Sequence, residues 1–287
     1  MPGKKIKYKI ALVTCYFGEA PWYLKFFLKS CEYNPRVDFF IIGDLAISNV
    51  FLPENVFLIN MSLEEFGIQA SQKLGLAVNV TRPYKLCDLK PAYGVIFGDL
   101  LDGYDFWGHG DIDVIFGDIR GFITNKILAR FDVICVREEY VTGFFSLFRN
   151  NHQINHLFEQ SKDYEEVFTN PKHYCFDECN FAWTPLMAGV SIFDIRTPID
   201  SMTHVVKRLD AEGSIKAHFN FMVIEGLCGD MEWNRGNLYY ANKIEAILYH
   251  LVKFKRQDDL VVPEWADVPD VFYIERNYFL NKSVYSK

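Results

Sequence analysis

The first 60 residues carry three short apolar runs, and a segment with helical signals lies between the first two. The runs are Lys9 to Phe17, Val37 to Ile42 and Asn55 to Ile59, and each has the length and composition of a buried strand. After the first run, Pro21 precedes the helical pattern of Trp22 to Tyr33. This strand-helix-strand rhythm predicts a mostly parallel, doubly wound sheet, in which ligands bind beyond the carboxyl ends of the strands.

The rest of the chain continues the mixed pattern less regularly. A capping box at Ser62 to Glu65 opens a helix, and Pro91 breaks or restarts the helix expected over Tyr84 to Leu101. Further on, we expect a helix over Asp118 to Arg130, a helix from about Asn151, a hairpin turn at Gly236-Asn237, and strands over Asp132 to Val136, Phe144 to Arg149, Val190 to Ile195 and Ala217 to Ile224. Without a linker or repeat, the prediction is one domain over residues 1–287, with halves at 1–118 and 119–287.

Composition excludes several classes of protein. The net charge of −7, from 30 basic and 37 acidic residues, argues against a nucleic-acid partner, which would require a broad basic face. The seven cysteines form no Cys-x-x-Cys, and the first residues lack the apolar run of a signal peptide. No apolar segment is long enough to span a bilayer. We therefore expect a reduced, cytoplasmic chain.

Asp111 and Asp113 follow the aromatic, strand-like run Tyr104 to Trp107. Alternate residues of a strand share a face, so the two carboxylates can point the same way while the residue between them faces the core. Gly108 and Gly110 would leave room for a bulky ligand at the backbone. Because hard carboxylate oxygens suit Mg²⁺ or Mn²⁺, the pair predicts a divalent-metal site. Two solvated turn aspartates are the alternative that so short a motif leaves open.

Three longer segments carry a resemblance to known proteins: Ile10 to Gly18, Pro83 to Gly94 (Pro-Tyr-Lys-Leu-Cys-Asp-Leu-Lys-Pro-Ala-Tyr-Gly) and Tyr104 to Asp118 (Tyr-Asp-Phe-Trp-Gly-His-Gly-Asp-Ile-Asp-Val-Ile-Phe-Gly-Asp). Together they resemble a family of bacterial polysaccharide-biosynthesis proteins, formerly a domain of unknown function, with the GT-A glycosyltransferase fold. More distantly, the chain is similar to galactosyltransferase-like retaining GT-A enzymes. The resemblance implies an α/β, Rossmann-like fold with helices on both faces of the sheet and a smaller acceptor-side subregion. It also implies a nucleotide-sugar donor, Mn²⁺ or Mg²⁺ on the diphosphate, and a glycan acceptor.

On this resemblance the carboxylate pair anchors the metal, and the C-terminal region supplies a third ligand. His250 is the candidate ligand, and Lys253 follows it at the spacing of a phosphate clamp. Lys255 or Arg256 could replace Lys253 at the diphosphate. The alternative is a surface histidine among solvated lysines.

The donor nucleotide is expected over the end of the first strand. Backbone hydrogen bonds and an aromatic face would come from Thr14, Cys15, Tyr16 and Phe17, although core packing is an equal reading of Tyr16. Asp44 would accept a hydrogen bond from the uracil or the ribose.

Three further residues near the metal motif are expected to contact the donor. The resemblance puts donor-sugar or nucleotide contacts at Lys85 and Asp88, and the alternative for two charges three residues apart on a helix is an exposed ion pair. His109, between two glycines, is expected to be structural or to face the donor sugar rather than to bind the metal.

The catalytic base is sought among carboxylates that follow the metal motif in the chain. An inverting transferase needs a base near the acceptor hydroxyl, whereas a retaining one can work without an obvious one. Asp177 is the first candidate and Glu178 the second; the alternative is a helix N-terminus stabilised by the dipole. Cys175 and Cys179 alone would make a poor zinc site.

The predicted function is transfer of a hexose, with galactose in pyranose or furanose form favoured, from a uridine diphosphate sugar. The acceptor would be an oligosaccharide or lipid-linked glycan of a growing capsule or O-antigen, and the reaction an inverting one. The alternatives are a retaining transferase and a non-catalytic glycan-binding module; a phosphohydrolase or nucleotidyltransferase is disfavoured because no phosphate-cradling glycine loop is present. The basic segments Lys4 to Lys9 and Lys253 to Arg256 could contact the inner face of the cytoplasmic membrane, but solvated charge near the termini is the preferred explanation.

Overall fold

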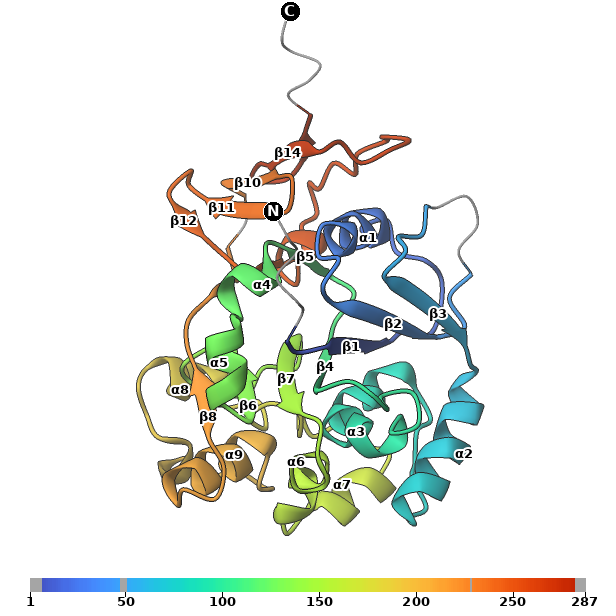
Figure 1. Cartoon of the computed structure of the whole chain (residues 1–287), viewed down its shortest axis with the longest axis vertical. Helices are drawn as coiled ribbons and strands as arrows, with labels where there is room; N and C mark the ends of the chain where they lie inside the picture. Colours follow the sequence, from blue (N-terminus) through green and yellow to red (C-terminus); the bar gives the residue numbers. More distant parts are fainter. Residues whose placement is uncertain (1–6, 47–50, 228, 282–287) are drawn as a thin grey trace, which may run out of the picture.

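A seven-stranded sheet runs through the middle of the protein, whose structure is a computed structural model that describes residues 7–46, 51–227 and 229–281 (Figure 1). Part of the basic segment Lys4 to Lys9 therefore lies outside the described residues. In spatial order the strands are β3 (Val56–Asn60), β2 (Asp38–Gly43), β1 (Ile10–Cys15), β4 (Phe106–Gly110), β7 (Phe145–Arg149), β6 (Val133–Cys135) and β8 (Ala217–Phe219). Only β7 is antiparallel to its neighbours, so the predicted mostly parallel sheet is confirmed.

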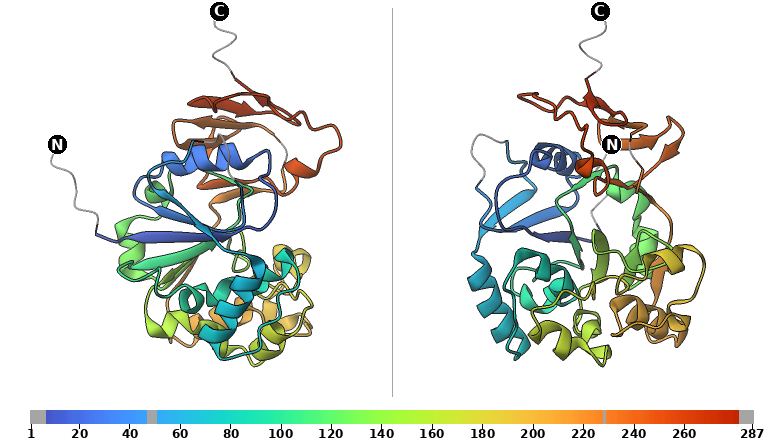
Figure 2. Two further views of the ribbon diagram at one scale, coloured as in Figure 1. Left: turned by 90° about the vertical axis from the view of Figure 1, so that its right-hand side faces the viewer. Right: turned by 180° about the vertical axis from the view of Figure 1, so that it is seen from behind.

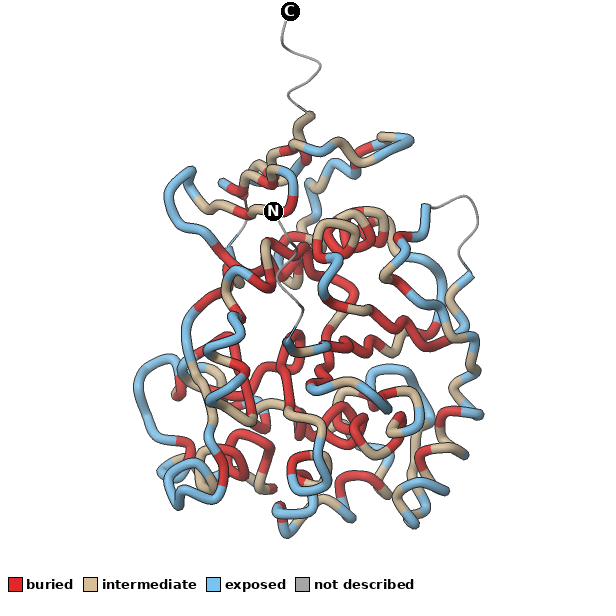
Figure 3. Tube along the Cα trace, viewed as in Figure 1, coloured by how far each residue is buried: buried red, intermediate tan, exposed pale blue. Residues whose placement is uncertain are grey.

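Helices cover both faces of this sheet, as the alternation of apolar residues in β1 requires. Ile10 and Leu12 belong to one apolar cluster, and Ala11 and Val13 belong to the other. The first face is covered by α1 (Leu24–Glu32), α4 (Ile119–Phe122) and α5 (Asn125–Arg130), and the second by α2 (Leu63–Leu74), η1 (Pro83–Ala92), α3 (Tyr93–Ile96), α6 (His152–Asn155), η2 (Leu157–Gln160), α7 (Tyr164–Thr169) and α9 (Met202–Ala211) (Figure 2). This is the Rossmann-like, α/β arrangement expected for a GT-A fold, and Figure 3 shows the buried residues concentrated along the central strands.

Two smaller sheets complete the structure. β5 (Val114–Phe116), β13 (Leu248–His250) and β9 (Val223–Glu225) form a three-stranded sheet. The other has five strands: β12 (Ile244–Glu245), β11 (Asn237–Tyr240), β10 (Met231–Asn234), β14 (Val271–Ile274) and β15 (Phe279–Leu280). It packs on α1 and the residue that follows it, where Phe272 contacts Phe26 and Trp233 contacts Tyr33. Within the described residues, no helix combines the length and the apolarity needed to cross a bilayer.

Several predicted elements are present with different forms. The helix expected over Tyr84 to Leu101 is a 3-10 helix with Pro91 inside it, followed by one short α-helix, because proline removes a helical N–H donor. The helix expected over Asp118 to Arg130 is split in two, since Thr124 caps a new helix start. The capping box of Ser62 and Glu65 is present as predicted.

One predicted strand is wrong, another is divided in two, and one predicted turn is displaced. Val190 to Ile195 contains a 3-10 turn, η3 (Ile192–Asp194), whose start is held by the Ser191 side chain. Ala217 to Ile224 is two strands, β8 and β9, that belong to different sheets. The hairpin joins β10 and β11 through Arg235 and Gly236, both with positive φ, so the turn lies one residue earlier than expected.

Candidate active site

A cavity of 620 Å³ lies at the carboxyl ends of β1 and β4. These neighbouring strands flank the point where the strand order reverses, which is where open α/β sheets bind ligands. The cavity is lined mainly by aromatic and ionisable side chains, among them Cys15, Tyr16, Phe17, Tyr84, Cys87, Lys90, Asp111, Asp113, Arg137, Tyr140, Asp177, Glu178, Trp183, Glu225, His250, Lys255 and Arg256.

Asp111, Asp113 and His250 converge in this cavity. One ligand atom from each lies within 4.8 Å of the others. The sequence suggested that the two aspartates share one face of a strand. They do not, because β4 ends at Gly110. They lie instead in the link that carries the chain from the central sheet to β5, where Asp111 N–H donates to the Phe144 carbonyl and the Asp113 carbonyl accepts from Leu251 N–H.

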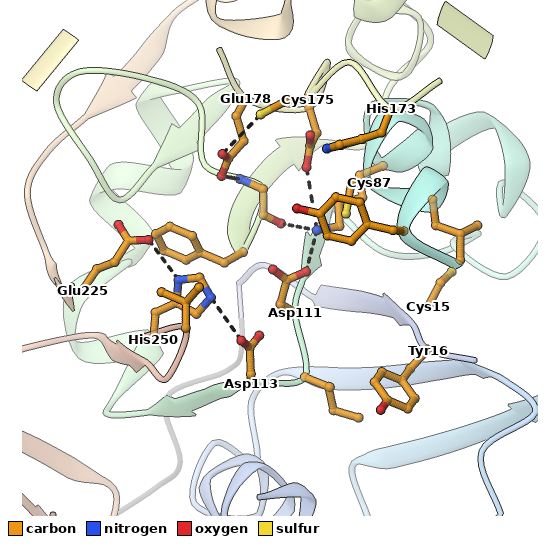
Figure 4. Close-up of a pocket in the computed structure, with 18 of the residues that line it drawn as sticks. Cys15, Tyr16, Cys87, Asp111, Asp113, His173, Cys175, Glu178, Glu225 and His250 are labelled. Carbon is orange, nitrogen blue, oxygen red and sulfur yellow. Dashed lines mark hydrogen bonds and ion pairs between the residues drawn. The ribbon is translucent and has the colours of Figure 1, made fainter. Parts of the chain in front are cut away.

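The register of the three-stranded sheet explains how residues more than a hundred positions apart meet. His250 is paired with Val114 of β5 on one side and with Glu225 of β9 on the other. Asp113 immediately precedes Val114, so the sheet places Asp113, His250 and Glu225 at one edge. Figure 4 shows His250 between the two carboxylates.

Charge at this edge is tightly paired. His250 Nδ1 lies 3.0 Å from Glu225 Oε1, and its Nε2 lies 3.4 Å from Asp113 Oδ2. Burial alone would lower the pKa of His250, but Asp113 and Glu225 outweigh it and raise the pKa to about 10. Lys255 Nζ lies 2.7 Å from Asp113, and together with His250 it holds the pKa of Asp113 below its usual value in spite of burial.

The donor set of the cluster fits a divalent metal. Two carboxylates and one imidazole suit Mn²⁺ or Mg²⁺, and Mn²⁺ accepts the imidazole more readily. A histidine ligand is commonly oriented by a carboxylate on its other ring nitrogen, and Glu225 occupies that position. Sequence reasoning missed Glu225, because nothing in its local pattern marks it.

Lys90 is a buried residue in the cavity lining, and sequence reasoning missed it as well. Its ammonium donates to Asp111 Oδ1 at 2.5 Å and to the Gly143 carbonyl at 2.9 Å, and it lies 3.7 Å from Asp177 Oδ2. Burial opposes the charge, but the surrounding acids, Asp111 first, raise the pKa of Lys90 well above its usual value. The signal that could have identified Lys90 is its position in the segment Pro83 to Gly94, which carries the family resemblance.

Asp177 and Glu178 both line the cavity, but they have different partners. Glu178 accepts from Gly143 N–H and from Trp183 Nε1–H, each at 2.7 Å. Asp177 has Lys90 as its ion-pair partner. Burial raises the pKa of Asp177 well above its usual value, and the charge of Glu178 adds to the effect while Lys90 opposes it. Burial raises the pKa of Glu178 as well, so the two acids differ in their partners: two N–H donors hold Glu178, and the ion pair with Lys90 holds Asp177.

The helix N-terminus considered for these two acids is wrong. Residues 176–181 form turns, and α8 (Trp183–Met187) begins beyond them. Cys175, Asn180 and Phe181 have left-handed backbone conformations, with φ values of 52°, 52° and 64°. Such conformations are costly for residues other than glycine and cluster at functional sites.

Lys85 and Asp88 do not line the cavity, and their pair is not exposed either. Both are fully buried, with Lys85 Nζ 2.8 Å from Asp88 Oδ2. Lys85 also donates to the carbonyls of Val167 and Lys172. Asp88 accepts from the N–H groups of Tyr174 and Phe176. The pair therefore anchors the segment that leads to Asp177, because buried charges need partners of this kind.

Four other candidates lie outside the cavity lining. His109 is buried and contacts the Gly143 carbonyl through Nδ1 at 3.1 Å, and burial lowers its pKa to about 3. Thr14 is buried. Asp44 is exposed and accepts from Gly18 N–H, where it shapes the loop after β1. Lys253 is exposed and does not line the cavity, whereas Lys255 lines it and lies 2.7 Å from Asp113.

The glycines of β4 serve packing rather than ligand approach. A Cβ on Gly108 would lie 2.5 Å from the Leu147 side chain and 2.7 Å from Leu12, its neighbours in the sheet. Neither Gly108 nor Gly110 lines the cavity. Cys15, the last residue of β1, lines the cavity together with Tyr16 and Phe17, which follow it.

Comparisons with known proteins complete the description. No curated protein matches the sequence. Among solved structures, one similar chain is the galactosyltransferase LgtC in complex with donor and acceptor sugar analogs; the identity is 12%, the match covers 75% of this chain and 76% of that chain, and the TM-score is 0.38. One family model, described as a family of unknown function (DUF6625), matches residues 12–283. Because this match spans nearly the whole sequence, the chain belongs to the family DUF6625.

Proposed function

We propose that the protein is a metal-dependent glycosyltransferase that transfers a hexose from a uridine diphosphate sugar to a growing bacterial surface polysaccharide. The observation that carries the proposal is the convergence of Asp111, Asp113 and His250 within 4.8 Å, at the switch point of a doubly wound sheet. A metal bound there supplies a Lewis acid for a diphosphate leaving group. On an exposed surface the same three residues would not indicate a metal site, because exposed acidic groups are common without a metal ion.

The residues around the cluster have roles that fit a nucleotide diphosphate. Lys255 and Arg256 line the cavity beside the candidate ligands, so they can pair with phosphate oxygens. Tyr16 and Phe17 follow β1 in the same cavity and offer aromatic faces to the base. The nucleotide would therefore lie over β1, and the first half of the domain would bind the donor.

Asp177 is the proposed general base of an inverting transfer. It lines the cavity 3.7 Å from Lys90 Nζ, and burial raises its pKa, which makes it a stronger base than an exposed carboxylate. Glu178, held by two hydrogen bonds, supports the wall. Galactose, in pyranose or furanose form, is the favoured sugar. A retaining transferase built on the same residues is the alternative.

The proposed acceptor is an oligosaccharide or lipid-linked glycan met in the cytoplasm, at or near the inner face of the cytoplasmic membrane. The six described cysteines are free thiols, which fits a reducing compartment. Capsule and O-antigen are the favoured polymers.

Thermal unfolding with uridine diphosphate tests the binding step. We expect stabilisation by the nucleotide only when Mn²⁺ is present, amounting to about 2.7 kcal/mol at a hundredfold excess over Kd. Asp113→Ala should lose it. Asp99→Ala is the matched control, because this exposed carboxylate pairs with Lys73, lies outside the cavity lining and should leave the stabilisation intact.

A screen of nucleotide sugars tests the chemistry. With Mn²⁺, we expect slow hydrolysis of at least one uridine diphosphate hexose, and loss of that hydrolysis in Asp113→Ala. Nucleotide binding without Mn²⁺ dependence, or no turnover of any common nucleotide sugar, would contradict the proposal. Glycan binding by a protein that shows neither Mn²⁺-dependent nucleotide binding nor turnover would favour the non-catalytic glycan-binding module.

A further inference from the structure

Four side chains form a continuous series of rings along one wall of the cavity, and we call Tyr84, His173, Phe181 and Trp183 the aromatic strip. Ring centroids are 4.6 Å apart between Tyr84 and His173, 5.4 Å between His173 and Phe181, and 5.6 Å between Phe181 and Trp183, all edge to face. Three of the four line the cavity. Tyr84 is 60% exposed and Phe181 is 48% exposed, so the strip also reaches the outer surface.

Buried carboxylates hold the middle and the inner end of the strip in place. His173 Nδ1 lies 3.2 Å from the buried carboxylate of Asp88, and Trp183 Nε1 donates to Glu178 at 2.7 Å. Figure 4 shows His173, Cys175 and Glu178 along the same wall. Because Glu178 is next to Asp177 in the chain, the strip leads from solvent to the proposed base.

Phe181 has a strained backbone that burial does not offset. Its conformation is left-handed, with φ of 64°, which is rare and strained for a bulky residue. About half of this side chain remains in water, and its ring packs on His173 and Trp183, which line the cavity. A strained residue that presents an aromatic ring to solvent in this position is a candidate for contact with a ligand.

The strip carries little charge. His173 is its only ionisable base, and it faces Asp88. The inner end of the strip is backed by carboxylates, because Trp183 donates to Glu178 and Asp177 is the adjacent residue in the chain. An anionic group at that end would approach these two acids.

We propose that the aromatic strip is the acceptor subsite and that it binds a neutral oligosaccharide. The apolar C–H faces of a pyranose ring match exposed aromatic faces, whereas a uronate or phosphate group would approach the carboxylates of Asp177 and Glu178. A glycan lying along the strip would bring its end to Asp177. The inference rests on the proposed transferase function, because an acceptor has meaning only with a donor.

Ligand-observed nuclear magnetic resonance on the full protein, without donor or metal, tests the subsite. Saturation transfer is expected to lactose, maltotriose or cellotriose, and not to digalacturonate. Tyr84→Ala should weaken binding of the neutral probe about fivefold to tenfold, as expected for one lost ring contact. Tyr84→Phe should retain the affinity. Tyr278→Ala, an exposed aromatic residue outside the cavity lining, is the matched control.

Phe181→Gly separates a binding role from a structural one. Glycine relieves the left-handed strain, so the melting temperature should be equal or higher while the affinity for the neutral probe falls about fivefold to tenfold. Lower stability with unchanged affinity would overturn the proposal. Binding of none of the three neutral sugars, or tighter binding of digalacturonate, would do so as well. Mn²⁺-dependent binding of uridine diphosphate by the unaltered protein tests the transferase proposal separately.

Discussion

Lys90 Nζ lies 2.5 Å from Asp111 Oδ1 and 3.7 Å from Asp177 Oδ2. One buried ammonium therefore links a candidate metal ligand to the candidate base. Because both carboxylates share this cation, the metal cluster and the proton acceptor are electrostatically coupled. Figure 4 shows the hydrogen bond to Asp111 at the centre of the cavity.

Replacement of Lys90 should tighten metal binding. In Lys90→Gln the ammonium no longer competes for Asp111, so we expect Mn²⁺ affinity to rise about tenfold, which is about 1.4 kcal/mol. Repulsion between an ammonium and a divalent ion a few ångströms apart is at least this large. Titration calorimetry measures the change, with Lys73→Gln, whose ion pair to Asp99 is exposed, as the control. Weaker Mn²⁺ binding in Lys90→Gln would show that the lysine supports the metal site instead.

Removal of the charge on Glu225 should have the opposite effect. Glu225 Oε1 lies 3.0 Å from His250 Nδ1 and orients the imidazole toward Asp113. Carboxylates in this position typically contribute tenfold to a hundredfold to metal affinity, so we expect Glu225→Gln to weaken Mn²⁺ binding by about that factor. Glu139→Gln is the control, because it removes the other acidic partner of Arg137 without touching His250. An equal loss in both variants would point to Arg137.

The parts of the site that could be predicted from the sequence are those fixed by local pattern. The apolar run of β1 predicted a strand end that brings Tyr16 and Phe17 to the cavity. Parallel strands end at a common edge, so the Asp111 and Asp113 pair after β4 was expected nearby. The position of His250 beside that pair came from the family resemblance.

The parts that could not be predicted depend on register between distant segments. Glu225 meets His250 because β9 and β13 pair in one particular alignment, which no local pattern encodes. Lys85 and Asp88 were expected to contact the donor, with an exposed helix pair as the alternative, yet tertiary packing buries both completely. Gly108 looked like room for a ligand, but it accommodates the neighbouring strands instead.

Loss of the buried pair should cost stability in a pH-dependent way. Burial disfavours the charge of Asp88, but His173 and Lys85 outweigh it and hold its pKa below the usual value. As pH falls, the unfolded chain therefore takes up this proton first, so the stability that Asp88 contributes is present above about pH 4 and is lost as pH falls through the folded-state pKa. We expect Asp88→Asn to cost about 3 kcal/mol at pH 7, because Lys85 remains buried without its partner.

Urea denaturation at pH 7 and pH 3 measures this difference. The gap between the unaltered protein and Asp88→Asn should narrow at the lower pH. Asp99→Asn, which breaks only the exposed pair with Lys73, should change the free energy of unfolding by less than about 1 kcal/mol at either pH. A gap that is the same at pH 7 and pH 3 would contradict the ionic role of Asp88.

Gly143 provides a test of the candidate base that leaves the metal ligands untouched. Its N–H donates to Glu178 and its carbonyl accepts from Lys90. A Cβ at this position would overlap Asp177 Oδ2 and lie 3.1 Å from Glu178, so Gly143→Ala must displace the Asp177 carboxylate. If Asp177 takes the proton from the hydroxyl group of the acceptor sugar, the rate of glycosyl transfer should fall about a hundredfold in Gly143→Ala, which is the smaller end of the range for general bases. The affinity for Mn²⁺ should stay within about twofold. Gly67→Ala is the matched control, because its Cβ would meet open space in the middle of α2 and should slightly raise the stability of the protein. Unchanged transfer in Gly143→Ala, with Asp177 displaced, would remove Asp177 from the reaction.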